Sequence, residues 1–113
     1  MLEPRPWKSK SSGAGLAGAT LYAANLTGAN LSNANLTGAN LGGATLTNAN
    51  LSQANLAQAN LSHAHLDAAN LMRTNLIGAS LYNATLTGAN LSGADTRGAQ
   101  FLEYANTTGA NLT

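Results

Sequence analysis

The chain has 113 residues, a formal net charge of +1 and no cysteine, so its length fits one domain and neither a disulfide framework nor a thiolate metal site is available. Only 8% of the residues are charged and 4% are aromatic, while Ala, Leu, Asn, Gly and Thr dominate. This composition argues against the mixed apolar core of an ordinary globule, and the weak charge gives no field that would draw nucleic acid or a membrane to the chain.

The first 13 residues, MLEPRPWKSKSSG, contain both prolines and three of the five basic residues. They lack the apolar stretch of a secretory signal, and no run in the chain approaches the roughly 18 apolar residues of a membrane span. We expect residues 1–13 to be flexible, with Trp7 able to fold over the beginning of the adjoining domain. A cytoplasmic location is the default expectation. Nucleic-acid binding would rest on only Arg5, Lys8 and Lys10, so no nucleic-acid partner is expected.

Leucine recurs at every fifth position from Leu16 to Leu91, and this periodicity organises the rest of the chain. Thr96 and Phe101 continue the phase, one extra residue enters near 102–104, and Thr107 and Leu112 resume it one position later. Alanine stands two places before each central residue from 14 to 110, with Thr74 as the single exception, and the residue just before the centre is Asn in most repeats. Residues 14–113 are therefore twenty tandem repeats of Ala-Asn-Leu-X-X.

A period of five excludes the two common regular structures. It matches neither the 3.6-residue period of a helix nor the two-residue period of a flat strand, so the leucines would spiral around a helix or alternate between the faces of a strand. A chain that turns a corner once in each repeat satisfies the pattern, because Ala and Leu then both point inward on every side. The sequence predicts a coiled, all-β solenoid with this core: Leu16, Leu21, Leu26, Leu31, Leu36, Leu41, Leu46, Leu51, Leu56, Leu61, Leu66, Leu71, Leu76, Leu81, Leu86, Leu91, Phe101 and Leu112.

The segment Ala-Asn-Leu-Thr-Gly, which occurs at 24–28, 34–38 and 84–88, resembles the motif of the pentapeptide-repeat family. The resemblance covers residues 14–113. It implies a right-handed quadrilateral β-helix with four repeats in each coil, and hence about five coils. At about 4.8 Å for each stacked strand, such a rod would be about 24 Å long.

The last position of each repeat predicts the turns. It is Gly in nine repeats and Asn in three, and these residues tolerate the positive φ that the third residue of a type II turn requires. In the third coil, residues 56–75, this position holds Gln58, His63, Ala68 and Arg73 instead. We expect turns of another type in that coil.

The polar side chains offer little chemistry. His63, His65 and Asp67 are the sharpest metal candidates, but three ligand-type residues on an open surface favour solvated side chains, and no metal or other cofactor is expected. The outward Asn, Ser and Thr have no activating base and a filled rod has no cleft, so we expect no catalytic residue. The asparagines are expected to form ladders, bonding one another or nearby backbone, and Asp95 with Arg97 to form an exposed ion pair.

The large outward residues suggest one candidate site. Tyr82, Leu102 and Tyr104 would lie together near the C-terminal end and form a small apolar patch for a protein partner, or else cover the irregular last coil. Open strand edges at the ends of a solenoid suggest a second interaction, end-to-end association of identical chains. The same open ends also fit a fragment of a longer protein or an engineered repeat scaffold.

The function that the sequence favours is a non-enzymatic structural or protein-binding module. The family resemblance implies one alternative, a rod that mimics duplex DNA and modulates a type II topoisomerase. Mimicry of DNA requires negative charge along the whole rod, whereas the repeats carry only Asp67, Asp95 and Glu103 against two arginines. The sequence therefore argues against this alternative.

Overall fold

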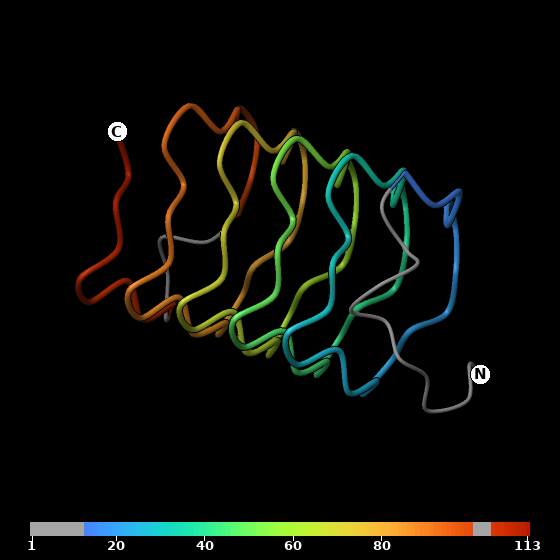
Figure 1. Ribbon diagram of the computed structural model, residues 1–113, viewed down its shortest axis with the longest axis horizontal. Helices are drawn as coiled ribbons and strands as arrows, with labels where there is room; N and C mark the ends of the chain where they lie inside the picture. Colours follow the sequence, from blue (N-terminus) through green and yellow to red (C-terminus); the bar gives the residue numbers. More distant parts are fainter. Residues whose placement is uncertain (1–12, 101–104) are drawn as a thin grey trace.

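The computed structural model describes residues 13–100 and 105–113, which form one rod with principal extents of 31 × 20 × 20 Å. Figure 1 shows the chain winding as a stack of coils along the long axis, with the first described coil, in blue, and the C-terminal residues, in red, at opposite ends. These residues contain no helix, and every strand is a single residue in a parallel bridge. The stack already includes Gly13, whose N–H donates to the Ser32 carbonyl at 2.8 Å, while the rest of the predicted flexible segment lies outside the described residues.

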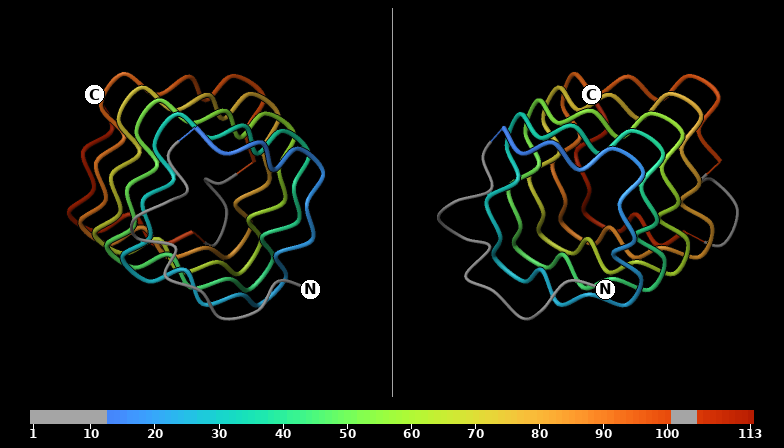
Figure 2. Two further views of the ribbon diagram at one scale, coloured as in Figure 1. Left: turned by 45° about the vertical axis from the view of Figure 1, so that its right-hand side comes forward. Right: turned by 90° about the vertical axis from the view of Figure 1, so that its right-hand side faces the viewer.

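The register of the stack is given by sixteen parallel bridges. Fourteen of them join residues that are 20 positions apart, such as Asn55 and Asn75, and 20 positions are four repeats. We call each such stretch a coil; Figure 2 shows successive coils superposed when the rod is viewed toward its end. The last two bridges, which begin at Thr85 and Asn90, join residues 21 apart. The predicted one-residue slip is thus confirmed, although residues 101–104 lie outside the described part.

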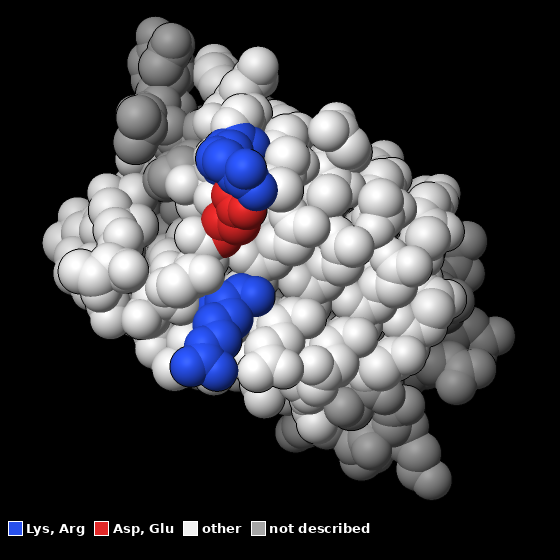
Figure 3. Space-filling model, turned by 90° about the horizontal axis from the view of Figure 1, so that it is seen from above, with Lys and Arg blue, Asp and Glu red and all other residues white. Residues whose placement is uncertain are grey.

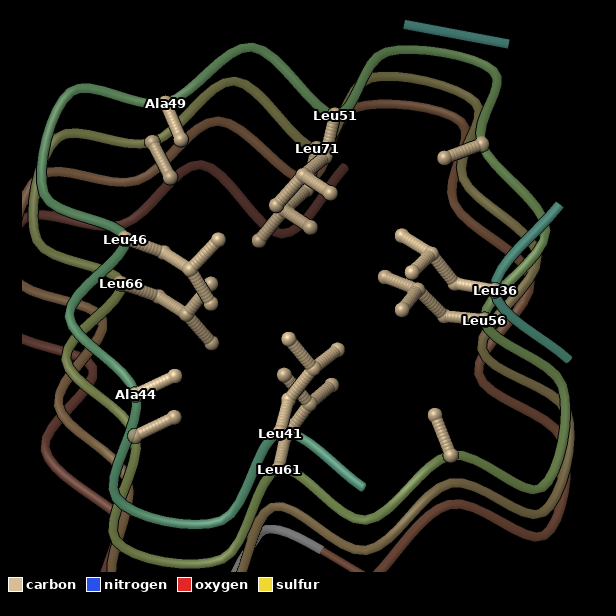
Figure 4. Packing of buried hydrophobic residues seen from close by; sticks show 14 of the residues in the cluster. Leu36, Leu41, Ala44, Leu46, Ala49, Leu51, Leu56, Leu61, Leu66 and Leu71 are labelled. Atoms are coloured by element: carbon tan, nitrogen blue, oxygen red, sulfur yellow. The ribbon is translucent and has the colours of Figure 1, made fainter. Parts of the chain in front are cut away.

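The interior is built from leucine and alanine. Each leucine at a repeat centre from Leu21 to Leu91 is at most 3% exposed. Figure 4 shows leucines of successive repeats entering the interior from four directions, each with a leucine of the next coil beside it: Leu36 and Leu56, Leu41 and Leu61, Leu46 and Leu66, Leu51 and Leu71. Burial of each such side chain contributes about 1.5 to 3 kcal/mol.

The predicted core is wrong at its C-terminal end. Leu112 is 52% exposed, because it lies in the last described coil and has a neighbouring coil on one side only. At the other end Leu16 is only partly buried, for the same reason. Phe101 lies outside the described residues. Periodicity therefore places a side chain in phase with the core, but the neighbouring coils decide how deeply it is buried.

A repeat with the full motif in the middle of the stack satisfies all of its backbone N–H groups, as residues 54–58 illustrate. The N–H of Ala54 closes a turn onto the Leu51 carbonyl at 3.0 Å, and that of Asn55 donates to the preceding coil. The N–H groups of Leu56 and Gln58 donate to the next coil at 2.7 and 2.9 Å. The remaining N–H, that of Ala57, donates to Asn55 Oδ1 at 3.0 Å. The Asn of the motif thus accepts from the one N–H that the coils leave without a backbone acceptor.

This role recurs at all twelve asparagines that directly precede a repeat centre in the described residues: Asn25, Asn30, Asn35, Asn40, Asn50, Asn55, Asn60, Asn70, Asn75, Asn90, Asn106 and Asn111. Bonding to nearby backbone, one of the two roles expected for Asn, is therefore confirmed. The other role, a ladder of Asn side chains, is reduced among the described residues to one long contact from Asn60 Nδ2 to Asn40 Oδ1 at 3.5 Å. A ladder does not form because each Asn Oδ1 already accepts from the backbone N–H two residues later in its own repeat.

The prediction of another turn type in the third coil is wrong. Gln58, His63, Ala68 and Arg73 have φ values of 61°, 62°, 60° and 57°, in the same left-handed region as the glycines of the other coils. This conformation costs a residue with a side chain about 1 to 2 kcal/mol. The bonds of the turn and the stack offset that cost, because the N–H of the residue at this position donates to the next coil and the following N–H closes the turn. The stack therefore imposes the turn on whichever residue occupies the position.

Thr74, the single departure from Ala, is accommodated by a hydrogen bond. Its side chain is 1% exposed, and its Oγ1 donates to the Leu51 carbonyl of the preceding coil at 2.8 Å. That carbonyl already accepts from the N–H of Ala54. The second lone pair of the carbonyl thus satisfies a hydroxyl that would otherwise be buried without a partner.

Candidate functional site

The backbone polar groups of a repeat are directed along the rod or into its turns, so each side presents mainly side chains to solvent. The outward residues are those just before and just after each central residue, together with the turn residue that comes next. Among the described residues, four large apolar side chains are exposed: Tyr22 at 62%, Met72 at 37%, Tyr82 at 47% and Leu112 at 52%. These and the few charged residues distinguish one side from another.

The predicted partner patch is described in part. Tyr82 is exposed as expected, and its ring stands edge-on to the ring of His63, with 5.8 Å between the ring centroids and an interplanar angle of 84°. Leu102 and Tyr104 lie outside the described residues. The patch therefore stays a prediction.

A second aromatic residue lies on the same side of the rod as Tyr82. Tyr22 and Tyr82 are 60 positions apart, which is three coils, so both occupy the position after the central leucine on one side. The ring of Tyr22 lies over Gly42 of the next coil, since a Cβ added to Gly42 would be 3.3 Å from Tyr22 Cδ1. Sequence reasoning named Tyr82 as a large outward residue but did not connect it with Tyr22, although a separation that is a multiple of 20 is the signal that aligns them.

We call this surface the tyrosine side. The residues directly before and after Leu21, Leu41, Leu61 and Leu81 on this side are uncharged: Thr20, Tyr22, Asn40, Gly42, Asn60, Ser62, Ser80 and Tyr82. Ser62 Oγ and Ser80 Oγ share a hydrogen bond of 3.0 Å, and the turn residue His63 contacts the ring of Tyr82. The tyrosine side thus carries an aromatic ring at two of its coils, with small or amide-bearing residues between them.

The metal candidates have polar partners of their own. Asp67 accepts from Thr85 Oγ1 at 2.8 Å and from the Thr87 N–H at 3.1 Å. Thr85 occupies a position that is usually Asn, and an Asn there would accept from the Thr87 N–H. The Asp67 carboxylate of the preceding coil accepts from that N–H instead. Nδ1 of His65 lies 3.4 Å from Thr85 Oγ1, and Nδ1 of His63 lies 3.1 Å from Asn83 Nδ2. The described residues contain no group of three His, Cys, Asp or Glu that could hold a metal ion.

The predicted pair of Asp95 and Arg97 is confirmed. Arg97 Nη2 lies 2.6 Å from Asp95 Oδ2, and Arg97 Nε lies 2.9 Å from Asp95 Oδ1. The hydrogen bonds from the guanidinium, with the backbone N–H of Arg97, lower the pKa of the Asp95 carboxyl, and the same pairing raises the pKa of Arg97. Figure 3 shows charged side chains gathered in one zone of an otherwise uncharged face. Both partners are solvent-exposed, so the pair contributes little to stability.

No helix in the described ranges is long and apolar enough to cross a membrane. The expected absence of a membrane partner stays a prediction.

The repeats match a family model. The model for pentapeptide repeats, in eight copies, matches residues 14–53 and 54–93. These two ranges cover well over half of the chain. No curated protein sequence matches this chain.

Solved structures agree with the family model. A pentapeptide repeat protein from the cyanobacterium Cyanothece 51142 is 44% identical with a TM-score of 0.75, and the match covers 77% of this chain and 58% of that one. A pentapeptide repeat protein from the thylakoid lumen of Arabidopsis thaliana is 30% identical with a TM-score of 0.76, covering 79% of this chain and 62% of that one. QnrB1, a plasmid-mediated fluoroquinolone resistance protein, is 21% identical with a TM-score of 0.52, over 94% of this chain and 61% of that one, and shows the fold alone.

The chain therefore spans about three fifths of the length of the two more similar structures. The family and these neighbours imply a right-handed β-helix, in agreement with the parallel bridges between successive coils. The chain belongs to the pentapeptide-repeat family.

Proposed function

We propose that the chain is a non-enzymatic interaction module, in which a right-handed quadrilateral β-helix of about five coils holds outward side chains in a fixed array for a protein partner. The observation that carries this proposal is the filled interior. Leucine and alanine occupy it from coil to coil, and the central leucines from Leu21 to Leu91 are at most 3% exposed. Bridges 20 residues apart, the length of four repeats, support the four-sided form.

The outward polar groups support a non-enzymatic role. Many hydroxyls bond the Asn of their own repeat, as Thr27 Oγ1 and Thr37 Oγ1 do at 2.7 Å to Asn25 and Asn35. A hydroxyl that donates to a neutral amide has no general base beside it and is not an activated nucleophile. The chemistry on the sides is therefore that of recognition by hydrogen bonds and packing.

The charges of the described rod do not favour DNA mimicry. The described residues carry two acidic and two basic side chains: Asp67, Asp95, Arg73 and Arg97. One acidic residue is paired with an arginine, which leaves no continuous negative surface. A substitute for duplex DNA needs a dense line of negative charge.

Tyr82, with Leu102 and Tyr104, is the surface that we propose contacts the partner, because exposed aromatic residues dominate the energetics of protein interfaces. The test is affinity capture from the organism that encodes the chain, with the wild-type rod and a Tyr82→Ser, Leu102→Ser variant as baits. A partner captured by the wild type and lost from the variant would support the proposal. Met72→Ser, a change to an exposed side chain on another side, is the matched control and should retain the partner.

Equal capture by the wild type and the Tyr82→Ser, Leu102→Ser variant would remove this patch as the interaction site. Size-exclusion chromatography with light scattering of the same samples tests end-to-end association of identical chains. Such association should survive the patch substitutions, because it would use the ends of the stack and not a side.

A further inference from the structure

Three of the four charged side chains in the described rod lie in one zone. Asp95 lies one coil beyond Asn75, since these two residues form a parallel bridge, and Arg73 occupies the turn that leads to Asn75. Arg97 pairs with Asp95 at 2.6 Å. Figure 3 shows two basic side chains and one acidic side chain gathered on this face. We call Arg73, Asp95 and Arg97 the arginine corner; two positive charges against one negative charge give it a net charge of +1.

Arg73 is held at its stem and has no partner at its guanidinium group. Its Cγ lies over Gly93 of the next coil, because a Cβ added to Gly93 would be 3.2 Å from that atom. The stem is thus directed toward the coil that holds Asp95 and Arg97. The guanidinium makes no hydrogen bond or ion pair with the residues at 13–100 and 105–113, and Arg73 is exposed. Its N–H donors therefore face solvent.

The fold does not account for an arginine at this turn. Arg73 has a φ of 57°, a conformation that glycine adopts without strain. Other large turn residues of the same coil make contacts that the stack can use: the side chain of Gln58 lies over Gly78, and His63 stands against the ring of Tyr82. Residues held in strained conformations cluster at functional sites. The unpaired guanidinium of Arg73 is thus a candidate for recognition.

Arg97 is oriented by Asp95 and still has donors to offer. Asp95 Oδ1 accepts from the Arg97 backbone N–H at 3.2 Å, as the Asn of the motif would, and from Arg97 Nε at 2.9 Å. Asp95 Oδ2 accepts from Arg97 Nη2 at 2.6 Å. Two of the five N–H groups of the guanidinium are then used, and the other three remain on a side chain that is 79% exposed. Asp95 therefore positions Arg97 and leaves its outer edge to a ligand.

The chemistry of the arginine corner fits a ligand that carries more than one carboxylate. A guanidinium binds a carboxylate through two parallel N–H···O bonds. One such pair on an exposed surface is weak, because solvent screens it, so a ligand is held only if it contacts both arginines. Ile77 lies one coil before Arg97 on the same side and is partly exposed, which adds an apolar contact beside the charges.

We propose that the arginine corner binds an extended acidic peptide segment of another protein, with one carboxylate on Arg73 and a second on Arg97. Arg97 follows Arg73 by 24 residues, which is one coil and four residues. Their Cα atoms are therefore at most about 5 Å apart along the rod and about 13 Å apart across it, at about 4.8 Å for each coil and about 3.3 Å for each residue.

This separation sets the spacing of acidic residues in the partner. Four residues of an extended chain span about 13 Å, and every second side chain points the same way. Two acidic residues with three residues between them can thus reach both arginines. An aliphatic residue at the middle position points the same way and can contact Ile77. The partner is expected to contain the pattern Glu-X-Leu-X-Glu or a close variant with Asp or another aliphatic residue.

The test compares two blocked peptides, Glu-Thr-Leu-Thr-Glu and Gln-Thr-Leu-Thr-Gln, by NMR titration of the rod. At about 0.01 M salt the Glu peptide should bind about fivefold more tightly than the Gln peptide, because only the former pairs with guanidinium groups. The difference should shrink at about 0.15 M salt, where the screening length falls from about 30 Å to about 8 Å. The Nε–H signals of Arg73 and Arg97 should both shift with the Glu peptide.

Moving the charge separates this site from an effect of net charge. Arg73→Gln should lower the affinity for the Glu peptide about fivefold, to that for the Gln peptide. The matched control combines Arg73→Gln with Gln53→Arg. Gln53 occupies the same turn position one coil earlier and has a φ of 60°, so this variant keeps the net charge and moves the guanidinium one coil away from Arg97. It should bind the Glu peptide as weakly as Arg73→Gln does, with an unchanged circular dichroism spectrum.

Three results would overturn the proposal: equal binding of the two peptides, no effect of Arg73→Gln, or full affinity in the control that carries Gln53→Arg. Tighter binding of a DNA duplex than of the Glu peptide at the same salt concentration would instead assign the corner to nucleic acid. None of these results bears on the patch of Tyr82, Leu102 and Tyr104. That patch includes no residue of the arginine corner, and its own capture experiment tests it separately.

Discussion

Truncation of Leu56 to Ala tests the packed interior at the middle of the rod. Leu56 is fully buried, as are Leu36 and Leu76, the leucines one coil away on either side. Loss of a buried leucine side chain typically costs about 2 to 5 kcal/mol, and the cost is greatest where the surroundings cannot close over the cavity.

The geometry around Leu56 places it in the upper half of that range. Its own N–H donates to Asn75 at 2.7 Å, its carbonyl accepts from Ala59 at 3.0 Å, and the Asn55 N–H bonds the preceding coil at 2.9 Å. The backbone is therefore fixed to the turn and to both neighbouring coils and cannot move inward. We expect a loss of about 4 kcal/mol, which lowers the melting temperature by about 15 °C in a domain of this size.

Leu112→Ala is the matched control, since it is the same substitution at the same position of the repeat in a side chain that is 52% exposed. It should cost less than about 1 kcal/mol. Thermal unfolding followed by far-UV circular dichroism, with a urea titration for the free energy, measures both variants. Similar losses for Leu56→Ala and Leu112→Ala would refute the reasoning, and so would an unchanged melting temperature of Leu56→Lys, which places an unpaired charge in the interior.

Three further substitutions or titrations test the turns, the buried hydroxyl and the ion pair. Ala68→Gly should stabilise the rod by up to about 1 kcal/mol in urea unfolding, because glycine adopts the φ of 60° at this position without strain; a loss of stability would contradict the strain argument. Thr74→Val should cost about 1 kcal/mol in the same assay, since it removes the hydrogen bond to the Leu51 carbonyl, and a neutral result would show that this bond adds nothing. The NMR titration midpoint of the Asp95 carboxyl should lie below the usual value of about 3.9 and rise toward it in Arg97→Gln. Because the folded-state pKa is lowered, the small stabilisation from the pair is present above the unfolded-state pKa and is lost as the pH falls through the folded-state value. An Asp95 midpoint that Arg97→Gln leaves unchanged would show that the pair does not persist in solution.

The pattern of Leu and Ala predicted the coiled path and the slip after Phe101, because both depend on which residues must face inward. Four repeats in each coil came only from the family resemblance, since a period along the chain does not state how many corners close one coil. The exposure of Leu112 was missed for a related reason. Phase is a property of the sequence, whereas burial depends on the coils that lie on either side.

The turns of the third coil show where local preference fails. The sequence predicted a different turn in the third coil, where Gly and Asn are absent, yet His63 and Arg73 adopt the same positive φ as the glycines. Propensity treats each residue by itself, whereas each turn residue of that coil is held by bonds to the next coil and across the turn. The alignment of Tyr22 with Tyr82 follows from the coil of four repeats that the family resemblance implied, and it was missed because that number was applied only to the large residues near the C-terminal end.

The same hydrogen-bond arrangement explains why functional information in this fold lies in departures from the motif. When Asn precedes the central Leu of a repeat in the middle of the stack, as at residues 54–58, every N–H of the repeat is satisfied, and the side offers a partner little that differs from the other sides. At Thr85, where the motif departs from Asn, the Asp67 carboxylate of the preceding coil takes over the missing acceptor role, so Asp67 is accounted for by the fold. Tyr22 packs over Gly42 and Tyr82 stands edge-on to His63, yet both rings remain substantially exposed. Their exposed surfaces are departures from the motif, and exposed aromatic side chains are the kind of residue that dominates recognition.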